Sequence, residues 1–275
     1  MNKKIQFTIF IMVILIPLSI GLVNSVSDDK ATVESYLTNG GVITQSESPV
    51  WTSGETDNPV WTQGTNMPAP TRYHGASVSY SRNDTNWLYC FAGDENGSGS
   101  NSAVVSIYNA TTNSWSTGAP CPPTLVFYCT ASKLGNVAYI IGGIGPGGAF
   151  TSAVNEVKRY NIATNTWLSN SANYPITIAS GGQGSAGYQD SLIYVVGGLG
   201  NGTSNGVNNV NVYNAISNTW RTCTAFPVAT WGGACGISGD TLVYVCGAPT
   251  YGGFGTSTVY RGVISRTDRS ATDSS

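Results

Sequence analysis

Few side chains in this sequence have the types and spacing that acid–base, nucleophilic or metal chemistry requires. His74 is the single histidine among 275 residues. No cysteine or carboxylate pattern around it has the spacing of a zinc site, so a hydrogen-bonded structural role is the simpler interpretation, with a catalytic or metal role as the alternative. The six cysteines contain no Cys-x-x-Cys pair, which argues against zinc binding and thiol exchange. We predict no catalytic residue, no metal site and no cofactor.

The carboxylates of the central region are also scattered. Three of them fall in short turns, where aspartate favours the turn geometry: Asp84, Asp190 and Asp240. Glu156 stands close to Lys158 and Arg159, which is typical of a solvated strand face. Asp94 and Glu95 differ, because they lie in a loop, and loops on a rigid scaffold often bind ligands.

Aromatic side chains offer stacking, and many of them recur in a fixed pattern. The motif Tyr-Asn-x-x-x-Asn-x-Trp occurs three times, with copies 52 and 53 residues apart. Its tyrosines and tryptophans are Tyr108 and Trp115, Tyr160 and Trp167, and Tyr213 and Trp220. A period of this length indicates a repeat architecture, and aromatics at one fixed place in every unit are expected to pack between units.

Each unit has the elements of a four-stranded meander. Short apolar runs that end in small residues predict buried second strands. The runs begin at Tyr89, Tyr139, Tyr194 and Tyr244, and end at Gly142-Gly143 and Gly197-Gly198, with Ala92-Gly93 and Gly247-Ala248 as degraded copies. Turn residues precede each run, a glycine-rich loop follows it, and the next segment, such as 207–214, is expected to be a half-exposed outer strand. One such sheet cannot bury both faces alone, so radially stacked copies are expected.

The repeat resembles the kelch motif, in which a di-glycine ends the second strand and a tyrosine and a tryptophan follow. The resemblance covers about residues 59–264, and "MPAPTRYHGA" at 67–76 is similar to the usual opening of a kelch blade. It implies an all-β, kelch-type β-propeller of about four four-stranded blades, similar to the central domain of galactose oxidase. Kelch propellers usually have more blades, so the chain is either an unusually small ring or an incomplete one.

Trp61 suggests how such a ring closes. Pro68 follows it at the distance that separates Trp115 from Pro122, so Trp61 is predicted to lie in a fourth strand whose first three strands lie elsewhere. The last unit has no Asn-x-Trp ending after Tyr260. The N-terminal strand is therefore expected to complete the C-terminal blade and remove exposed sheet edges, with "PVWTSG" at 49–54 as a competing copy.

A ligand site is expected to break the repeat, because one ligand contacts different blades differently. The non-repeating candidates for ligand binding are Asp94, Glu95, Phe150, Trp231, Tyr251 and Phe254. Three of these aromatics lie in glycine-rich loops, where an exposed ring is a predicted contact for a protein or a glycan.

The N-terminus has the features of a secretory signal. Lys3 and Lys4 precede an almost entirely apolar stretch, and small or branched residues at 23–25 fit a cleavage site. The alternative is an uncleaved membrane anchor, since the stretch approaches the ~20 residues of a spanning helix. We expect a signal peptide at 1–25, a polar linker at 26–58, the propeller at 59–264 and a polar tail at 265–275, in a protein that is secreted or at the cell surface, extracellular or periplasmic.

The cysteines and glycosylation motifs agree with export. An even number of cysteines suggests disulfide bonds. Cys235 and Cys246 flank a turn nearly symmetrically and are expected to face one another across a hairpin. Asn-x-Ser/Thr sequons, which predict a glycoprotein in a eukaryotic host, occur at Asn83, Asn96, Asn109 and Asn201.

Composition and resemblance together give a functional expectation. The net charge of −2 argues against a nucleic-acid partner. We expect a binding module for a protein or a glycan. The alternative is a small secreted sugar-modifying enzyme, because secreted sialic acid mutarotases also resemble kelch propellers. Galactose oxidase activity is not expected, since that family's copper site needs two histidines.

Overall fold

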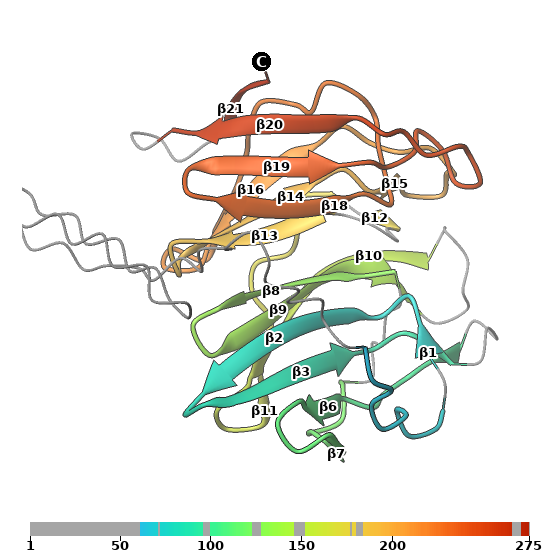
Figure 1. Cartoon of the computed structure of the whole chain (residues 1–275). Coiled ribbons are helices and arrows are strands. Elements are labelled where there is room, and N and C mark those ends of the chain that lie inside the picture. The colour runs from blue at the N-terminus through green and yellow to red at the C-terminus, as the bar shows by residue number, and fades with distance from the viewer. Residues whose placement is uncertain are drawn as a thin grey trace, which may run out of the picture. The chain divides into compact units, whose positions relative to one another are not determined.

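The computed structural model describes residues 61–70, 72–95, 100–122, 128–145, 152–176, 178–179, 184–265 and 271–274. The chain divides into two units, Met1–Thr62 and Gln63–Ser275, and the second is described here. Its named elements are all β-strands, and most belong to four antiparallel sheets, numbered sheet 1 to sheet 4 in chain order (Figure 1).

Each sheet contains four strands that follow one another in the chain. Sheet 1 consists of β2 (Ala76–Arg82), β3 (Thr85–Phe91), β6 (Ser106–Asn109) and β7 (Ser114–Thr117). Sheet 2 consists of β8 (Thr130–Leu134), β9 (Val137–Ile144), β10 (Ala153–Asn161) and β11 (Thr166–Leu168). Sheet 3 consists of β13 (Gly184–Tyr188), β14 (Leu192–Val196), β16 (Val210–Asn214) and β17 (Thr219–Thr222). Sheet 4 consists of β18 (Ala234–Ser238), β19 (Thr241–Val245), β20 (Val259–Ile264) and β21 (Ala271–Ser274).

Five two-residue strands lie in the connections. A small separate sheet is formed by β1 (Arg72–Tyr73), β4 (Asp94–Glu95) and β5 (Ser100–Asn101). The other two extend sheet 2 from β10: β12 (Ile178–Ala179) and β15 (Leu199–Gly200). Among the described residues, no helix is long and apolar enough to cross a membrane.

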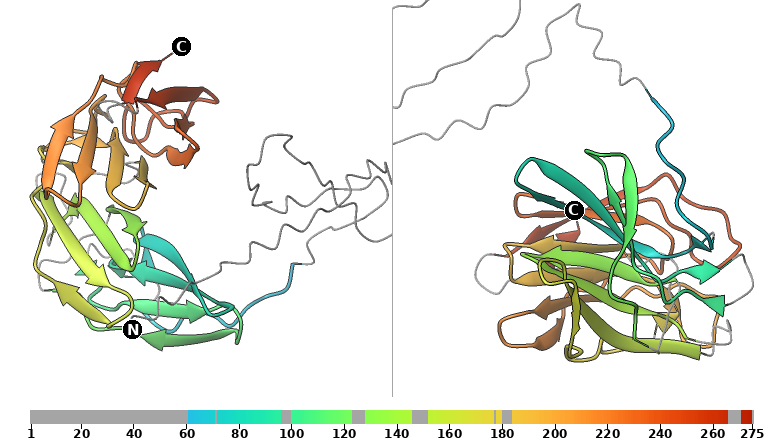
Figure 2. Two further views of the ribbon diagram at one scale, coloured as in Figure 1. Left: turned by 90° about the vertical axis from the view of Figure 1, so that its left-hand side faces the viewer. Right: turned by 90° about the horizontal axis from the view of Figure 1, so that it is seen from below.

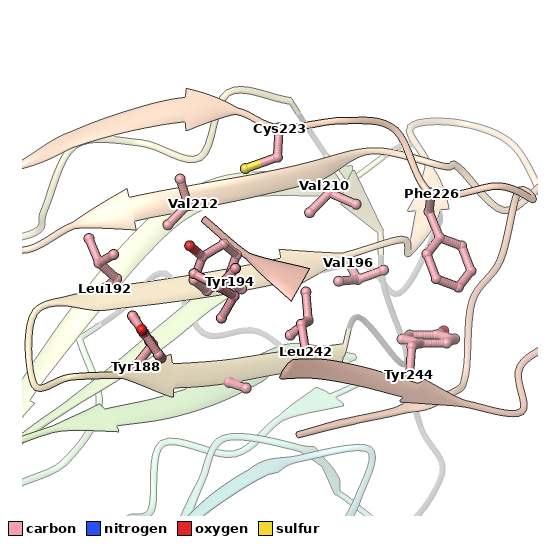
Figure 3. Close-up of a cluster of buried hydrophobic side chains, with 12 residues drawn as sticks. Tyr188, Leu192, Tyr194, Val196, Val210, Val212, Cys223, Phe226, Leu242 and Tyr244 are labelled. Carbon is pink, nitrogen blue, oxygen red and sulfur yellow. The ribbon is translucent and has the colours of Figure 1, made fainter. Parts of the chain in front are cut away.

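The four sheets pack one against the next. Their first strands β2, β8, β13 and β18 are neighbours in chain order, and Figure 2 shows the sheets following one another. Three apolar clusters are each shared by two consecutive sheets. Figure 3 shows one of them, in which Tyr194 and Val196 of sheet 3 meet Leu242 and Tyr244 of sheet 4. The predicted all-β propeller of four four-stranded blades is confirmed.

The predicted turns between first and second strands are also confirmed. Asn83 and Asp84 in sheet 1, and Gln189 and Asp190 in sheet 3, all have φ between 48° and 58°. Such paired left-handed residues form the two-residue turn that suits the twist of a hairpin. Gly239 provides the same backbone conformation in sheet 4.

Sheet 4 is offset by one residue from the predicted alignment. In sheet 3 the second strand ends in the positive-φ pair Gly197–Gly198, and in sheet 4 this pair is Cys246–Gly247, with φ of 64° and 98°. Val243 therefore occupies the position of Tyr194. Tyr244 points the opposite way and is buried against sheet 3.

The predicted ring closure is wrong. Residues 61–68 form no strand, and the Trp61 side chain is 90% exposed. β21 takes the fourth position of sheet 4 instead, although it lies within the expected polar tail. A strand that follows β20 directly closes a much shorter loop than one near residue 61, and loop closure costs more entropy as the loop lengthens.

Two predictions of exposure are also wrong. The third strand β16 is buried on both faces rather than half-exposed, and Asn211 within it donates to Tyr174 Oη at 2.8 Å. Lys158 is 3% exposed, and its Nζ lies 2.5 Å from Glu156 Oε2. Both changes have one cause, because sheets 2 and 3 are each covered by neighbouring sheets on both faces.

Candidate functional site

The repeated Tyr-Asn-x-x-x-Asn-x-Trp motif joins consecutive sheets. In sheet 3, the Oδ1 atom of Asn218 accepts hydrogen bonds from Tyr213 Oη and from the Ala172 amide, both at 2.8 Å. Trp220 Nε1 donates to the Ala172 carbonyl at 2.8 Å. Ala172 lies in the segment that arrives from sheet 2, so its main chain is held from both sides. We call this arrangement the Asn–Trp clamp.

The same clamp occurs in the other two copies. Asn165 and Trp167 hold the main chain of Ala119, with distances of 2.7 and 3.0 Å. The third clamp, formed by Asn113 and Trp115, holds Thr65, with both distances 2.7 Å. In each of the three copies, the motif residues thus bind the main chain of a segment that precedes their sheet.

The non-repeating loops gather at the opposite end of the sheets. In an antiparallel meander, the loop between the second and third strands and the connection to the next sheet leave from one end. The turn between the third and fourth strands, which carries the motif, leaves from the other. We call the first of these the loop end, and the predicted ligand-binding residues that the structure describes belong to it: Asp94, Glu95, Trp231, Tyr251 and Phe254.

Trp231 and Tyr251 form the best-defined part of the loop end. Their ring centroids lie 5.2 Å apart. Trp231 exchanges two backbone hydrogen bonds with Ala248, each 2.9 Å long, and the Tyr251 amide donates to Ser204 at 2.7 Å. Trp231 packs against the small cluster of Ile144 and Leu199, whereas its buried Nε1 finds no acceptor among the described residues. Backbone bonds and ring packing therefore hold this pair in place.

Phe254 extends from the same loop into solvent. Its side chain is 96% exposed, and that of Tyr251 is 45% exposed. Gly252, between them, has a φ of 75°, a conformation that residues with a Cβ rarely adopt. The glycine-rich sequence therefore serves to present two rings on a sharply turning backbone.

A second aromatic pair lies at the loop end where sheets 1 and 2 begin. His74 stacks on Tyr128, with centroids 3.9 Å apart and an interplanar angle of 21°. Tyr128 packs against the small apolar cluster of Ile144 and Leu199, as Trp231 does. We call His74, Tyr128, Trp231, Tyr251 and Phe254 the aromatic row.

The two acidic residues predicted to bind a ligand, Asp94 and Glu95, are less exposed than Phe254. Asp94 is 4% exposed, within β4, where it pairs with Tyr73, and Glu95 is half-buried. Partial burial lowers the pKa of His74 below its usual 6.5, and the charge of Asp94 opposes this shift. Asp94 is therefore close enough to His74 for its charge to act on the imidazole. Phe150 lies outside the described residues.

Two members of the aromatic row were not among the predicted ligand-binding residues. Tyr128 and His74 each stand two residues before the first strand of a sheet, and Trp231 stands three before one. An aromatic residue shortly before the first strand in three of four units is a signal that the sequence contains. Their stacking also requires left-handed backbone at His74 and Tyr128, with φ of 56° and 53°, which no residue type there suggests.

The cysteines and metal-ligating residues do not add a second site. No disulfide bond joins the six cysteines in this structure, and Cys235 pairs across its hairpin with Tyr244 rather than Cys246. The hairpin thus does not place the two candidates opposite one another, and a disulfide bond between them stays a prediction. Among the described residues, no three His, Cys, Asp or Glu side chains gather as metal ligands.

Comparisons with known proteins agree with the repeat geometry. The KLHDC2/KLHL20/DRC7 Kelch-repeats domain matches residues 34–247. Kelch-like protein 23 of Homo sapiens is 28% identical over 150 residues, which are 54% of this chain and 25% of that protein, and Kelch-like protein 23 of Pongo abelii matches equally. The match thus spans a quarter of the length of these relatives. Because the domain match covers more than half of the chain, the chain belongs to the kelch repeat family.

Proposed function

We propose that this protein binds a partner protein through the aromatic row at its loop end. The kelch propeller supports a protein-interaction module. The observation that carries the proposal is the 96% exposure of Phe254 beside a Trp231–Tyr251 pair fixed by backbone hydrogen bonds. Transfer of an exposed apolar ring from water into an interface is favourable, so a partner that covers Phe254 would be bound more tightly.

The chemistry of the aromatic row favours a protein over a small ligand. Tyrosine and tryptophan are enriched among the residues that dominate binding energy at protein interfaces, because they bury a large area and lose little rotamer freedom. The row is also spread over the loops of several sheets. Nothing in the described residues or in the comparisons favours the sugar-modifying alternative.

A screen of protein and glycan arrays with the full chain tests the proposal. We expect protein ligands whose affinity falls at least about tenfold in Phe254→Ala and Tyr251→Ala, since a truncated central aromatic typically costs more than ~1.4 kcal/mol. Ile216→Ala is the matched control, because Ile216 is 86% exposed in a turn at the opposite end. If glycans bind instead, or if both loop variants keep full affinity for every protein ligand, the proposal fails.

The proposal includes export, which rests on residues 1–25, outside the described part of the chain. Two sequons agree with it, since Asn83 and Asn201 are exposed. Expression of the full chain in a cell with a secretory pathway should yield a product in the medium that begins close to residue 26. A full-length product that stays in the cytosol would contradict export and leave the binding proposal standing.

A further inference from the structure

Three interfaces within the chain share one geometry. In sheets 1 to 3, the face that carries the second-strand tyrosine packs on the next sheet and is called here the forward face. In sheet 4 the forward face is the one that carries Val243, opposite Tyr244. The back face is the other face of each sheet, and in sheets 1 to 3 it carries the motif tyrosine. The ring centroids of Tyr89 in sheet 1 and Tyr160 in sheet 2 lie 6.1 Å apart, and those of Tyr139 in sheet 2 and Tyr213 in sheet 3 lie 5.6 Å apart. Sheets 1 to 3 each bury their forward face in this way.

Among the described residues, no sheet packs on the forward face of sheet 4. Val259 and Val263 on this face are 54% and 52% exposed. Val259 pairs with Val245 as Val210 pairs with Val196 in sheet 3, and Val210 is only 3% exposed. The face therefore has apolar side chains at positions that are buried in the preceding sheet.

On the back face of sheet 1, side chains are more exposed than their counterparts in sheet 3. Leu88 is 38% exposed, and its counterpart in sheet 3, Ile193, is fully buried. Tyr108 is half-buried, whereas its counterpart Tyr213 is 1% exposed. Segment 63–67 covers part of this face through the clamp on Thr65, but no sheet of the described structure packs on it.

We propose that the forward face of sheet 4 in one copy of this chain packs on the back face of sheet 1 in a second copy. The two surfaces are of the kinds that already match three times within the chain, so the contact continues an existing interface. Val243 would face the partner's Tyr108, at the positions that Tyr139 and Tyr213 occupy between sheets 2 and 3.

Both faces of this contact carry an arginine. Arg261 projects from the forward face of sheet 4, and Arg159 occupies the same position in sheet 2. There Arg159 donates from Nε to the Ser169 carbonyl at 2.8 Å, beside the interface with sheet 3. On the back face of sheet 1, Ser77 and Ser79 of β2 are exposed and uncharged, and the Arg72 guanidinium donates to the Val104 carbonyl and to Ser106 Oγ.

The N-terminal segment of sheet 1 fits the same partner. In the internal connections, the amide of the residue before the clamped one donates to the preceding sheet. Gly118 donates to the carbonyl of Val105, directly before β6, at 2.9 Å, and Ser171 donates to that of Val157 in β10 at 3.0 Å. Gly64 is the corresponding residue before Thr65. By analogy, the acceptor for the Gly64 amide would lie in a sheet packed on the back face of sheet 1. In the proposed contact, the Val259 carbonyl of the second copy takes that position.

Head-to-tail contacts of this kind form a ring when the rotation between copies closes. Two copies would contribute eight sheets, which lies within the range of about four to eight blades found in propellers. Each copy would then cover both open faces of the other.

The solution mass of the full chain tests the proposal. Light scattering and sedimentation across the micromolar range should show twice the mass of one chain. Val263→Glu on the forward face and Leu88→Glu on the back face should each return the protein to the mass of a single chain. Both side chains are partly exposed, so the variants should keep the wild-type circular dichroism spectrum. Ile216→Glu, at a turn away from both faces, should keep the doubled mass.

A single-chain mass for the wild type at all these concentrations would overturn the proposal. So would loss of the doubled mass in only one of the two face variants, because a head-to-tail contact requires both faces. Tyr251→Ala and Phe254→Ala should leave the mass unchanged, which separates this test from that of the loop end.

Discussion

Asn165 shows how much structure one side chain supports in this fold. Its Oδ1 accepts the Tyr160 hydroxyl and the Ala119 amide, and its own backbone has a φ of 54°. Asparagine suits this position because it tolerates the left-handed conformation better than most residues. Its carbonyl oxygen also presents two lone pairs to two donors.

Replacing Asn165 with alanine should therefore destabilise the protein. Two donors lose their acceptor and a left-handed alanine is strained, so we expect Asn165→Ala to lower the free energy of unfolding by about 2–3 kcal/mol. Asn165→Asp retains both the acceptor and the backbone tolerance, and should stay within about 1 kcal/mol of wild type. Urea denaturation measures both. Equal losses in the two variants would show that the shared acceptor is not what matters.

The cysteines should differ sharply in reactivity. Burial raises the pKa of Cys129 to about 12 and that of Cys121 to about 11. Cys246 is exposed. In the reduced native protein at pH 8, Cys246 should react first with a thiol reagent, because only thiolates react and the buried thiols stay protonated. Cys246→Ser should remove this fast phase, and fast labelling of Cys129 would contradict the buried placement.

The raised pKa values also give a direction for pH. Cys129 ionises near 9.0 when unfolded and near 12 when folded. Its contribution to stability is therefore complete below pH 9 and is lost as the pH rises from there.

At the level of elements, adjacent sheets are brought close by glycine. A Cβ atom added to Gly184 of β13 would lie 3.0 Å from the Tyr244 ring and nearer still to Cys235 Cβ. Gly184→Ala should lower the free energy of unfolding by about 1–3 kcal/mol, because overpacking forces sheets 3 and 4 apart. The double variant Gly184→Ala/Cys235→Gly removes the clash and should lose less than the sum of its single changes. If thermal unfolding shows that the losses of the two single variants simply add in the double variant, the contact between residues 184 and 235 is not the cause of the destabilisation.

The sequence predicts elements well where a local signal repeats. The second strands, the aspartate turns and the Tyr–Trp pairs are all visible as recurring letters. The offset of sheet 4 is not, since Tyr244 matches Tyr194 in type, whereas the left-handed pair at Cys246–Gly247 decides the register. β21 could not be foreseen either, because Ala271–Ser274 has little apolar character and gains its place only by pairing with β20.

The candidate site is less predictable than the elements that support it. Phe254 and Tyr251 could be selected because they interrupt a repeat. Asp94 could not be recognised as buried, because the burial depends on the pairing of β4 with β1, two segments about twenty residues apart. The stacking of His74 on Tyr128 likewise joins connections that belong to different sheets.

At the scale of the whole molecule, sheets 2 and 3 are covered on both faces, so their amides should exchange more slowly than those of sheets 1 and 4. β9 and β14 in sheets 2 and 3 are almost wholly buried, whereas β3 and β19 in sheets 1 and 4 alternate between buried and less buried residues. In dilute protein, amide hydrogen exchange should be slowest in β9 and β14, since local opening there exposes most apolar surface. Uniform protection of the four second strands would contradict this.

The Asn–Trp clamp has a consequence for the history of such a chain. The three clamped residues are Thr65, Ala119 and Ala172, and the Asn and Trp side chains of the clamp bind only their amide and carbonyl groups. Thr65 adds one hydrogen bond of its own, from Oγ1 to the Asn113 carbonyl. Because the Asn and Trp side chains bind backbone groups, the clamp does not depend on which residue occupies the bound position, and one unit can replace another. Duplication or loss of a whole unit leaves every remaining joint intact, so the number of blades can change between descendants without any compensating substitution at the joints.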